Sequence, residues 1–233
     1  MITVAMTSRE AHRSDLPAND QSTVRAATIY LALGTNLGDR EANLGEALER
    51  IAALGLTITR RSSIYETEPV GYAEQGWFLN QVIEARMPRG LAFALNSQEA
   101  GRLARLFGSD VKLALAAQCA LLLGELLKIE SDMGRRRLVA DGPRLIDIDM
   151  LLCDHLAGVF CATRPDAAGS LWQEYGLPEL ILPHPCMHLR RFVLAPLAEI
   201  APDVIHPTLL RSCADLLAAL DDPAMVRLYQ GTA

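Results

Sequence analysis

One long amphipathic helix constrains this fold more than any other feature of the sequence. From about position 111 to 133, apolar residues recur at alternating spacings of four and three, at Leu115, Cys119, Leu122, Leu126, Ile129 and Met133. Such a stripe lies on one face of a helix and has to be buried against another layer of structure. We therefore expect the stripe to pack into a core rather than to bind a cofactor.

The elements around this helix give a recognisable order. The pattern predicts a strand at 28–33, a helix from Asp39 to Gly55 with Leu44, Leu48 and Ile51 inside, a strand from 56 to about 66, and strands at 77–83 and 145–153. Strand, helix, strand, strand, helix, strand is the ferredoxin-like βαββαβ order. It predicts an α+β sandwich: an antiparallel sheet with two helices on one face and the other face left for ligand.

Other regions carry weaker signals. A short helix is expected at 97–107 and a closing helix at 211–220, with a loop-rich stretch from 154 to 183. We interpret residues 1–27 as a flexible polar leader without a secretory apolar segment. The remainder, 28–233, is expected to be a single domain with helical and loop insertions at about 88–121 and 157–176.

Composition excludes several classes of protein. The formal net charge of −6 argues against a general affinity for nucleic acid, and five scattered cysteines argue against a disulfide framework or a zinc site. The longest uncharged apolar run, Leu113–Gly124, is too short to span a bilayer. We therefore expect a cytoplasmic protein with no nucleic-acid and no membrane partner.

Two aspartates, Asp147 and Asp149, stand two positions apart in the strand expected at 145–153. Because side chains alternate along a strand, both carboxylates face the same side of the sheet. Neighbouring carboxylates repel each other, and Mg²⁺ relieves that repulsion by binding them together with substrate phosphates. The alternative is an edge strand with hydrated aspartates.

A basic loop precedes this strand and contains Arg135, Arg136, Arg137 and Arg144. Guanidinium groups suit phosphate oxygens, so the loop and the aspartates together are typical of a nucleoside triphosphate site. The alternative is a hydrated basic turn that caps the long helix. The glycines at 34–38 do not match a Walker A loop, which disfavours a P-loop fold. His184 and His188, taken alone, fit structural roles as well as catalytic ones.

Four sequence blocks occur in a fixed order along the chain. They are YLALGTNLG at 30–38, YETEPVG at 65–71 with FLN at 78–80, GPRLIDID at 142–149, and a segment from Pro183 to Pro202 that ends in PLAEIAP. In this combination the chain resembles the 6-hydroxymethyl-7,8-dihydropterin pyrophosphokinases of folate biosynthesis, over about 28–207. The resemblance implies a ferredoxin-like fold and transfer of the β,γ-diphosphate of ATP to the pterin hydroxyl, with release of AMP.

The resemblance also implies roles for individual residues. Two Mg²⁺ ions are expected on Asp147 and Asp149, with ATP as co-substrate. The catalytic residues would be Arg135, Arg144, Asp147 and Asp149. ATP contacts are expected at Glu130, Arg135, Arg137, Arg144, Met150, Ile181, His184 and Arg190. Pterin contacts are expected at Thr67, Glu68, Val70, Gly71, Phe78, Asn80, Asp147 and Phe192, with the ring between the two phenylalanines.

The chain departs from the family pattern at a few positions. Asp141 replaces an aromatic residue common before Gly-Pro-Arg, Leu127 replaces a glutamine on the long helix, and Pro185 follows His184. The two insertions either cover the active site, form a dimer contact or are decoration, so we expect a monomer or a weak homodimer. The expected substrates are ATP and 6-hydroxymethyl-7,8-dihydropterin. The alternatives are a related diphosphokinase for another pterin and a non-catalytic nucleotide- or pterin-binding subunit.

Overall fold

A computed structural model gives the fold and describes residues 26–72, 74–87, 110–135, 142–163 and 167–231. The helices are α1 (Arg40–Ala53), α3 (Val111–Asp132), α4 (Ala167–Tyr175), α5 (Arg191–Ile200) and α6 (Cys213–Ala218), with a 3₁₀ helix, η1 (Met187–Leu189). The strands are β1 (Ala27–Thr35), β2 (Thr57–Arg61), β3 (Tyr65–Thr67), β4 (Phe78–Met87), β5 (Asp147–Cys153), β6 (Gly158–Phe160), β7 (Leu180–Leu182) and β8 (Val226–Leu228). The expected leader, up to residue 25, and the helix expected at 97–107 lie outside the described residues.

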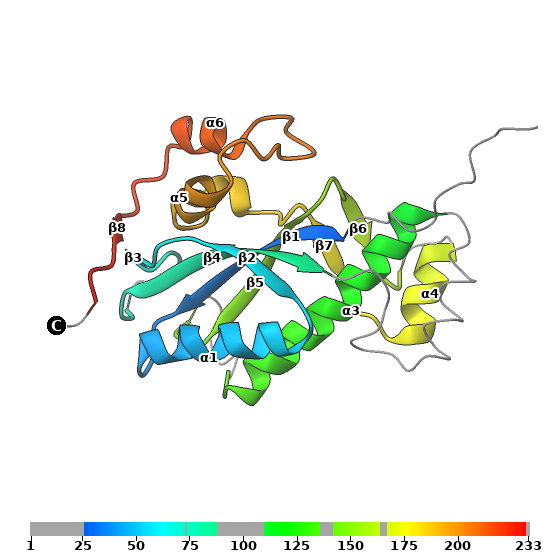
Figure 1. Cartoon of the computed structure of the whole chain (residues 1–233), viewed down its shortest axis with the longest axis horizontal. Coiled ribbons are helices and arrows are strands. Elements are labelled where there is room, and N and C mark those ends of the chain that lie inside the picture. Colours follow the sequence, from blue (N-terminus) through cyan, green and yellow to red (C-terminus); the bar gives the residue numbers. More distant parts are fainter. Residues whose placement is uncertain (1–25, 73, 88–109, 136–141, 164–166, 232–233) are drawn as a thin grey trace, which may run out of the picture.

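The main sheet has the strand order β5-β1-β4-β3-β8, and β2 pairs with β4 alongside β3. Each of these pairings is antiparallel. Helices α1 and α3 lie together on one side of the sheet (Figure 1). This arrangement confirms the ferredoxin-like α+β sandwich expected from the order of elements.

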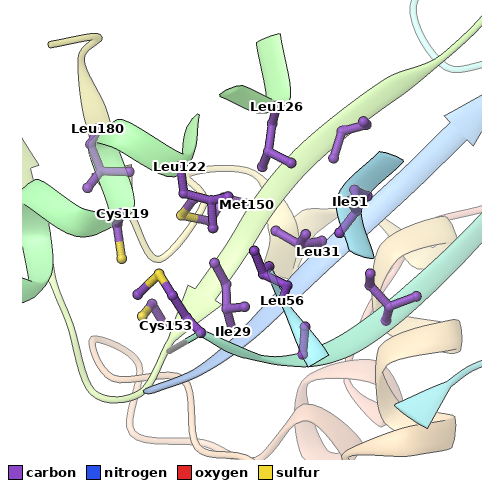
Figure 2. Packing of buried hydrophobic residues seen from close by; sticks show 14 of the residues in the cluster. Ile29, Leu31, Ile51, Leu56, Cys119, Leu122, Leu126, Met150, Cys153 and Leu180 are labelled. Atoms are coloured by element: carbon purple, nitrogen blue, oxygen red, sulfur yellow. The ribbon is translucent and has the colours of Figure 1, made fainter. Parts of the chain in front are cut away.

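The core between the sheet and these two helices follows from side-chain alternation. On β1, Ile29, Leu31 and Leu33 point toward the helices and are at most 1% exposed. They meet the stripe of α3, in which Leu122 and Leu126 are fully buried (Figure 2). The periodicity of the long helix is therefore satisfied by the sheet, as the sequence predicts.

Helix α1 begins and ends where the sequence indicates. The Asp39 side chain accepts a hydrogen bond from the Ala42 N–H at 3.0 Å, which caps the first turn. The helix stops before Gly55, whose φ of +89° is a left-handed conformation that other residues adopt only with strain. The Asn43 Nδ2 of α1 donates to the Leu37 carbonyl at 2.8 Å, which ties the loop before the helix to its first turn.

The second face of the sheet differs from the expectation. We expected this face to be left for ligand, but α5 and α6 cover most of it, packing on Tyr30, Val82 and Leu151. The apolar side chains on this face of β1, β4 and β5 require a cover of their own. In the part of the chain that the structure describes, the end of the sheet that carries Gly34 and Asp147 is open as a cleft.

Three further elements differ from the sequence prediction. The strand expected from 56 to 66 is divided at Ser62, because its Oγ accepts from the Val82 N–H and interrupts regular pairing. The stretch expected to be loop-rich contains α4, whose Trp172 is fully buried and stacks on Phe160. The terminal strand β8 was not expected, since three residues carry no clear periodicity. Within the described ranges, no helix is both long and apolar enough to span a bilayer.

Replacing Leu122 by alanine is expected to lower the free energy of unfolding by about 2–5 kcal/mol, because the lost side chain leaves a cavity in the core. Urea denaturation followed by circular dichroism measures this change. Val111→Ala, at a position 73% exposed on the same helix, is the matched control and should change stability by no more than about 0.5 kcal/mol. Equal losses in the two variants would contradict the placement of the core.

Candidate active site

A cleft opens at the uncovered end of the sheet. Its cavity volume is about 110 Å³, and it is open to solvent on one side. The lining residues are Ala32, Leu33, Gly34, Thr67, Glu68, Val70, Phe78, Asn80, Arg144, Asp147, Asp149, Arg190 and Phe192. They come from β1, β3, β4, β5 and α5 and the loops beside them, so the fold collects residues that are remote in sequence.

Small residues on β1 form the floor of the cleft. Gly34 is the register partner of both Asn80 on β4 and Asp147 on β5, and Ala32 is the partner of Asp149. A Cβ atom added at Gly34 would lie 2.8 Å from the Asn80 Oδ1, closer than real contacts allow. Gly34 therefore leaves room for the polar side chains on either side.

The paired aspartates lie where alternation along β5 predicts. Asp147 and Asp149 face the cleft, while Ile148 and Met150 point into the core beneath α3. Burial and the neighbouring Asp147 carboxylate raise the pKa of Asp149, and the nearby His184 and Arg190 side chains oppose that shift. The pair thus carries concentrated negative charge at the rim of the cleft.

Two arginines neutralise Asp147. Arg135 forms ion pairs with both Asp147 and Glu130, and the Arg144 Nη1 donates to the Asp147 Oδ2 at 2.5 Å. The Glu130 Oε1 also accepts from the Ile148 N–H at 2.7 Å, which ties the end of α3 to β5. Burial raises the pKa of Glu130 to about 7, despite the lowering effect of Arg135 and of the Ile148 N–H.

His184 faces the other aspartate. Its Nε2 lies 4.0 Å from the Asp149 Oδ1, and its Nδ1 accepts from the Cys186 N–H at 3.2 Å. Because Nδ1 is an acceptor, the proton of the neutral ring is on Nε2, which faces Asp149. Burial lowers the pKa of His184, while the Asp149 carboxylate opposes that shift. The backbone N–H of His184 donates to the Leu151 carbonyl at 2.9 Å and fixes the loop to β5.

The donor set of this site fits Mg²⁺. Asp147 and Asp149 supply hard carboxylate oxygens on one face, and a divalent cation would relieve the repulsion between these neighbouring carboxylates. Among the described residues, no group of three or more His, Cys, Asp or Glu side chains forms a complete protein cage. Mg²⁺ typically binds one or two carboxylates and completes its shell with waters and substrate phosphates, so the pair suits this ion.

Aromatic rings and arginines are paired at the cleft. Phe78 and Phe192 both line it, one from β4 and the other from α5. The Arg144 guanidinium lies 5.4 Å from the centroid of the Phe78 ring, and the Arg190 guanidinium lies 5.6 Å from that of Phe192. Flat apolar surfaces and fixed positive charges therefore adjoin each other, which suits a planar ring bound next to phosphate groups.

A polar group closes the inner end of the cleft. The Asn80 Nδ2 donates to the Thr67 Oγ1 at 2.7 Å, and both side chains are buried. The other hydrogen-bond donors and acceptors of Asn80 and Thr67 remain available to the polar edge of a ligand. Satisfied buried polar groups of this kind fix the orientation of a ligand.

Most of the expected site residues meet in the cleft, but some do not line it. Glu68 lines the cleft and also accepts from the Met225 N–H at 2.9 Å. Gly71, with a φ of +88°, is not among the lining residues, and neither are Glu130, Arg135 and His184, which lie beside the aspartates. Ile181 is exposed on β7, and the Met150 side chain is in the core. Arg137 lies outside the described residues.

Sequence reasoning missed Ala32 and Gly34. Ala32 was assigned to a strand and Gly34 to a loop, and neither was given a role in the site. A glycine within a strand signals close approach of another group, so this signal was available at Gly34. The alternation of large and small residues along 31–34 (Leu-Ala-Leu-Gly) also indicated a face that makes room for neighbours.

The sequence profile described as 7,8-dihydro-6-hydroxymethylpterin-pyrophosphokinase (HPPK) matches residues 30–105 and 107–202. A 2-amino-4-hydroxy-6-hydroxymethyldihydropteridine pyrophosphokinase of Bacillus subtilis is 36% identical over 75% of this chain and 78% of its own length. The enzyme of that name from Methylorubrum extorquens is 33% identical over 85% and 97%.

Longer proteins contain a matching part. The chain spans 25% of the folic acid synthesis protein fol1 of Pneumocystis carinii, at 26% identity. It also superposes on a crystal structure of HPPK-DHPS in complex with substrates with a TM-score of 0.54 and 13% identity, over 84% of this chain and 43% of that one. The superposition supports the fold alone. By its sequence profile and its curated relatives, this chain belongs to the HPPK family of pyrophosphokinases.

Proposed function

We propose that this protein transfers the β,γ-diphosphate of ATP to the hydroxyl of 6-hydroxymethyl-7,8-dihydropterin and releases AMP. One observation carries the proposal: a carboxylate pair flanked by arginines adjoins an aromatic cleft at the open end of the sheet. Such a site can hold a triphosphate and a planar alcohol side by side. Its family and its relatives' names are consistent with these substrates.

The phosphate half of the site is basic. We assign ATP phosphates to Arg135, Arg144, Arg190 and His184, which surround the two aspartates. In the protein alone, Arg135 and Arg144 are paired with Asp147, so substrate would exchange these ion pairs for contacts with phosphate oxygens. Arginine suits this exchange because its planar set of N–H donors matches the oxygens of either a carboxylate or a phosphate.

Asp147 and Asp149 would hold two Mg²⁺ ions between the triphosphate and the pterin hydroxyl. The chemistry supplied there is neutralisation of phosphate charge and polarisation of the transferred group. The residues of the chain contribute position: the carboxylates share one strand face, and β5 is hydrogen-bonded along β1. The number of ions is part of the proposal.

The pterin half of the site is aromatic and polar. Phe78 and Phe192 would contact the two faces of the ring, and Asn80 and Thr67 would bind its polar edge. The hydroxymethyl oxygen would then point toward the aspartate pair. Planar heteroaromatic rings are recognised by this combination of apolar faces and a few fixed polar groups.

The proposed reaction depends on alignment. The pterin hydroxyl releases its proton to water as its oxygen bonds to the β-phosphorus. The bond from that phosphorus to the α,β-bridging oxygen breaks, and AMP leaves with the bonding electrons. Holding two substrates in line supplies about 7–11 kcal/mol of the barrier. Phosphoryl-type transfer needs positioning and charge stabilisation more than a strong base, so we assign no separate side-chain base.

We also propose a single cytoplasmic domain over 28–233 that is a monomer or a weak homodimer. The described part of 28–233 packs around one six-stranded sheet, with a core on each face, and β6 and β7 form a second, two-stranded sheet. The insertion at 157–176 adds α4, which packs on β6 and contributes Trp172 to the helix-side core. Sedimentation equilibrium over a range of protein concentrations measures the oligomeric state directly.

Asp149→Asn is expected to reduce AMP formation by roughly 100-fold or more, because one of two metal-binding carboxylates is lost. The assay contains ATP, Mg²⁺ and 6-hydroxymethyl-7,8-dihydropterin, and separates AMP from ADP by chromatography. In wild type, AMP should form only when pterin and Mg²⁺ are both present, and chelation by EDTA should abolish it.

Asp132→Asn, at an exposed position near the end of α3, is the matched control and should retain wild-type activity. Formation of ADP instead of AMP would refute diphosphate transfer. Full activity in Asp149→Asn would refute the proposed metal site. Binding of both substrates without turnover would favour another pterin or a non-catalytic subunit.

Phe192→Ala is expected to raise the KM for the pterin about tenfold, because loss of one stacking surface costs on the order of 1–2 kcal/mol. The KM for ATP should change much less. Phe192→Tyr keeps the aromatic face and serves as the conservative control. Steady-state kinetics with each substrate varied in turn measure both constants, and a selective rise in the ATP KM would contradict the assignment.

A further inference from the structure

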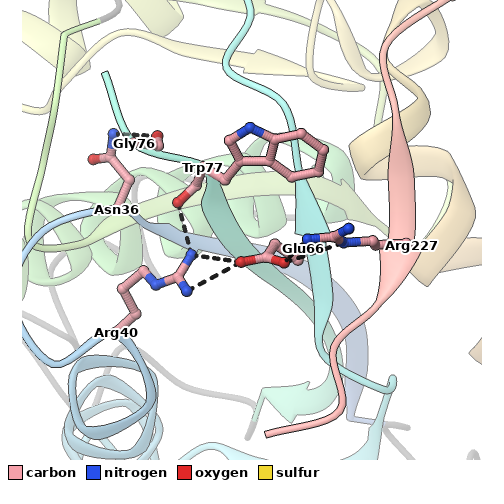
Figure 3. A network of polar contacts seen from close by, with 6 residues as sticks. All are labelled: Asn36, Arg40, Glu66, Gly76, Trp77 and Arg227. Carbon is pink, nitrogen blue, oxygen red and sulfur yellow. Dashed lines mark hydrogen bonds and ion pairs between the residues drawn. The ribbon is translucent and has the colours of Figure 1, made fainter. Parts of the chain in front are cut away.

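A partly buried carboxylate on the opposite face of β3 joins three distant parts of the chain. The Glu66 Oε1 accepts from the Nη1 and Nη2 of Arg40, each at 3.1 Å, and the Oε2 accepts from the Nε and Nη2 of Arg227, at 3.2 and 2.6 Å. Figure 3 shows Glu66 between the two guanidinium groups. Its side chain is 15% exposed, and the arginines hold the pKa of its carboxyl below the usual range.

This network is directly behind the pterin end of the cleft. Glu66 precedes Thr67, and Trp77 precedes Phe78, which is the register partner of Thr67. The Arg40 Nη1 also donates to the Trp77 carbonyl at 2.9 Å (Figure 3). Because side chains alternate along β3, Glu66 is on the rear face while Thr67 faces the cleft. The network therefore holds the backbone beside two expected pterin contacts.

Arg227 reaches this network from the C-terminal strand. Strand β8 pairs with β3, and Arg227 is the register partner of Glu66. Its guanidinium lies over the Trp77 ring, 4.8 Å from the centroid. The same segment exchanges two hydrogen bonds with Glu68, through the backbone N–H and carbonyl of Met225. The end of the chain thus contacts both sides of Thr67 and the residue before Phe78.

Because Arg227 is exposed, its removal should affect the position of its partners more than the stability of the domain. Its side chain is 60% exposed, and ion pairs of exposed groups contribute little to overall stability. Its loss would leave Glu66 paired with Arg40 alone and Trp77 without its stacked cation. The expected consequence is a change in where β3 and Trp77 sit, rather than unfolding of the domain.

We propose that Arg227 of the C-terminal strand is a positioning residue for pterin binding, acting through Glu66 and Trp77 on the backbone of Thr67 and Phe78. This inference rests on the proposed function. It adds a role for β8, which lies outside the matched family region that ends at residue 202. Arg227 acts through Glu66 and Trp77, neither of which lines the cleft, so it is a positioning residue and not a catalytic one.

The test compares substrate constants in the full-length protein. Arg227→Ala should raise the KM for 6-hydroxymethyl-7,8-dihydropterin about fivefold, and leave kcat and the KM for ATP within about twofold of wild type. Arg227→Lys keeps the charge without the bidentate fork and should recover part of the loss. Arg50→Ala removes the exposed pair with Glu46 on α1 and is the matched control, with no expected change.

A double-mutant cycle tests the route of the effect. If Arg227 acts through Glu66, then Glu66→Gln combined with Arg227→Ala should raise the pterin KM by less than the product of the single effects. An unchanged pterin KM in Arg227→Ala, equal rises for both substrates, or independent effects in the cycle would each overturn the inference. AMP formation by wild type is measured first, because its absence would refute the proposed function rather than the role of Arg227.

Discussion

Mutual repulsion between Asp147 and Asp149 is the constraint on which the rest of the site depends. Alternation along β5 forces both carboxylates onto one face, and the apolar residues between and after them anchor the strand in the core. The surrounding charges answer this repulsion: Arg135 and Arg144 pair with Asp147, while His184 and Arg190 face Asp149. A carboxylate pair with cationic side chains beside it is suited to binding metal and phosphate together.

The two faces of the sheet have different roles: one packs against the main core, and the other carries the cleft. On one face, α1 and α3 bury a continuous apolar core, and the Arg40–Glu66–Arg227 network closes the edge of the sheet. On the other, α5 and α6 leave the end near Gly34 uncovered. On β3, Glu66 therefore contacts the C-terminal strand while the next residue, Thr67, lines the cleft. This adjacency is the basis of the proposed coupling between the C-terminal strand and the cleft.

Sequence alone predicted the elements with strong periodicity or clear capping, such as α1 with Asp39 and α3 with its stripe. It also predicted that Asp147 and Asp149 share a face, since this follows from spacing two in a strand. It did not predict the cover of α5 and α6, because their apolar faces do not say which surface they bury. It missed β8 and the Glu66–Arg227 pair for the same reason: contacts between positions 161 residues apart leave no local pattern. Gly34 had a usable signal that was assigned to a loop.

Anomalous diffraction from crystals grown with Mn²⁺, a non-hydrolysable ATP analogue and the pterin substrate tests the account most directly. The proposed site predicts metal peaks coordinated by the carboxylates of Asp147 and Asp149, with phosphate oxygens completing the coordination shell. The pterin ring should lie between Phe78 and Phe192. The proposed site also predicts that Arg144 exchanges its bond to Asp147 for a phosphate contact. Metal bound elsewhere, or a ring outside the aromatic cleft, would contradict the central claim.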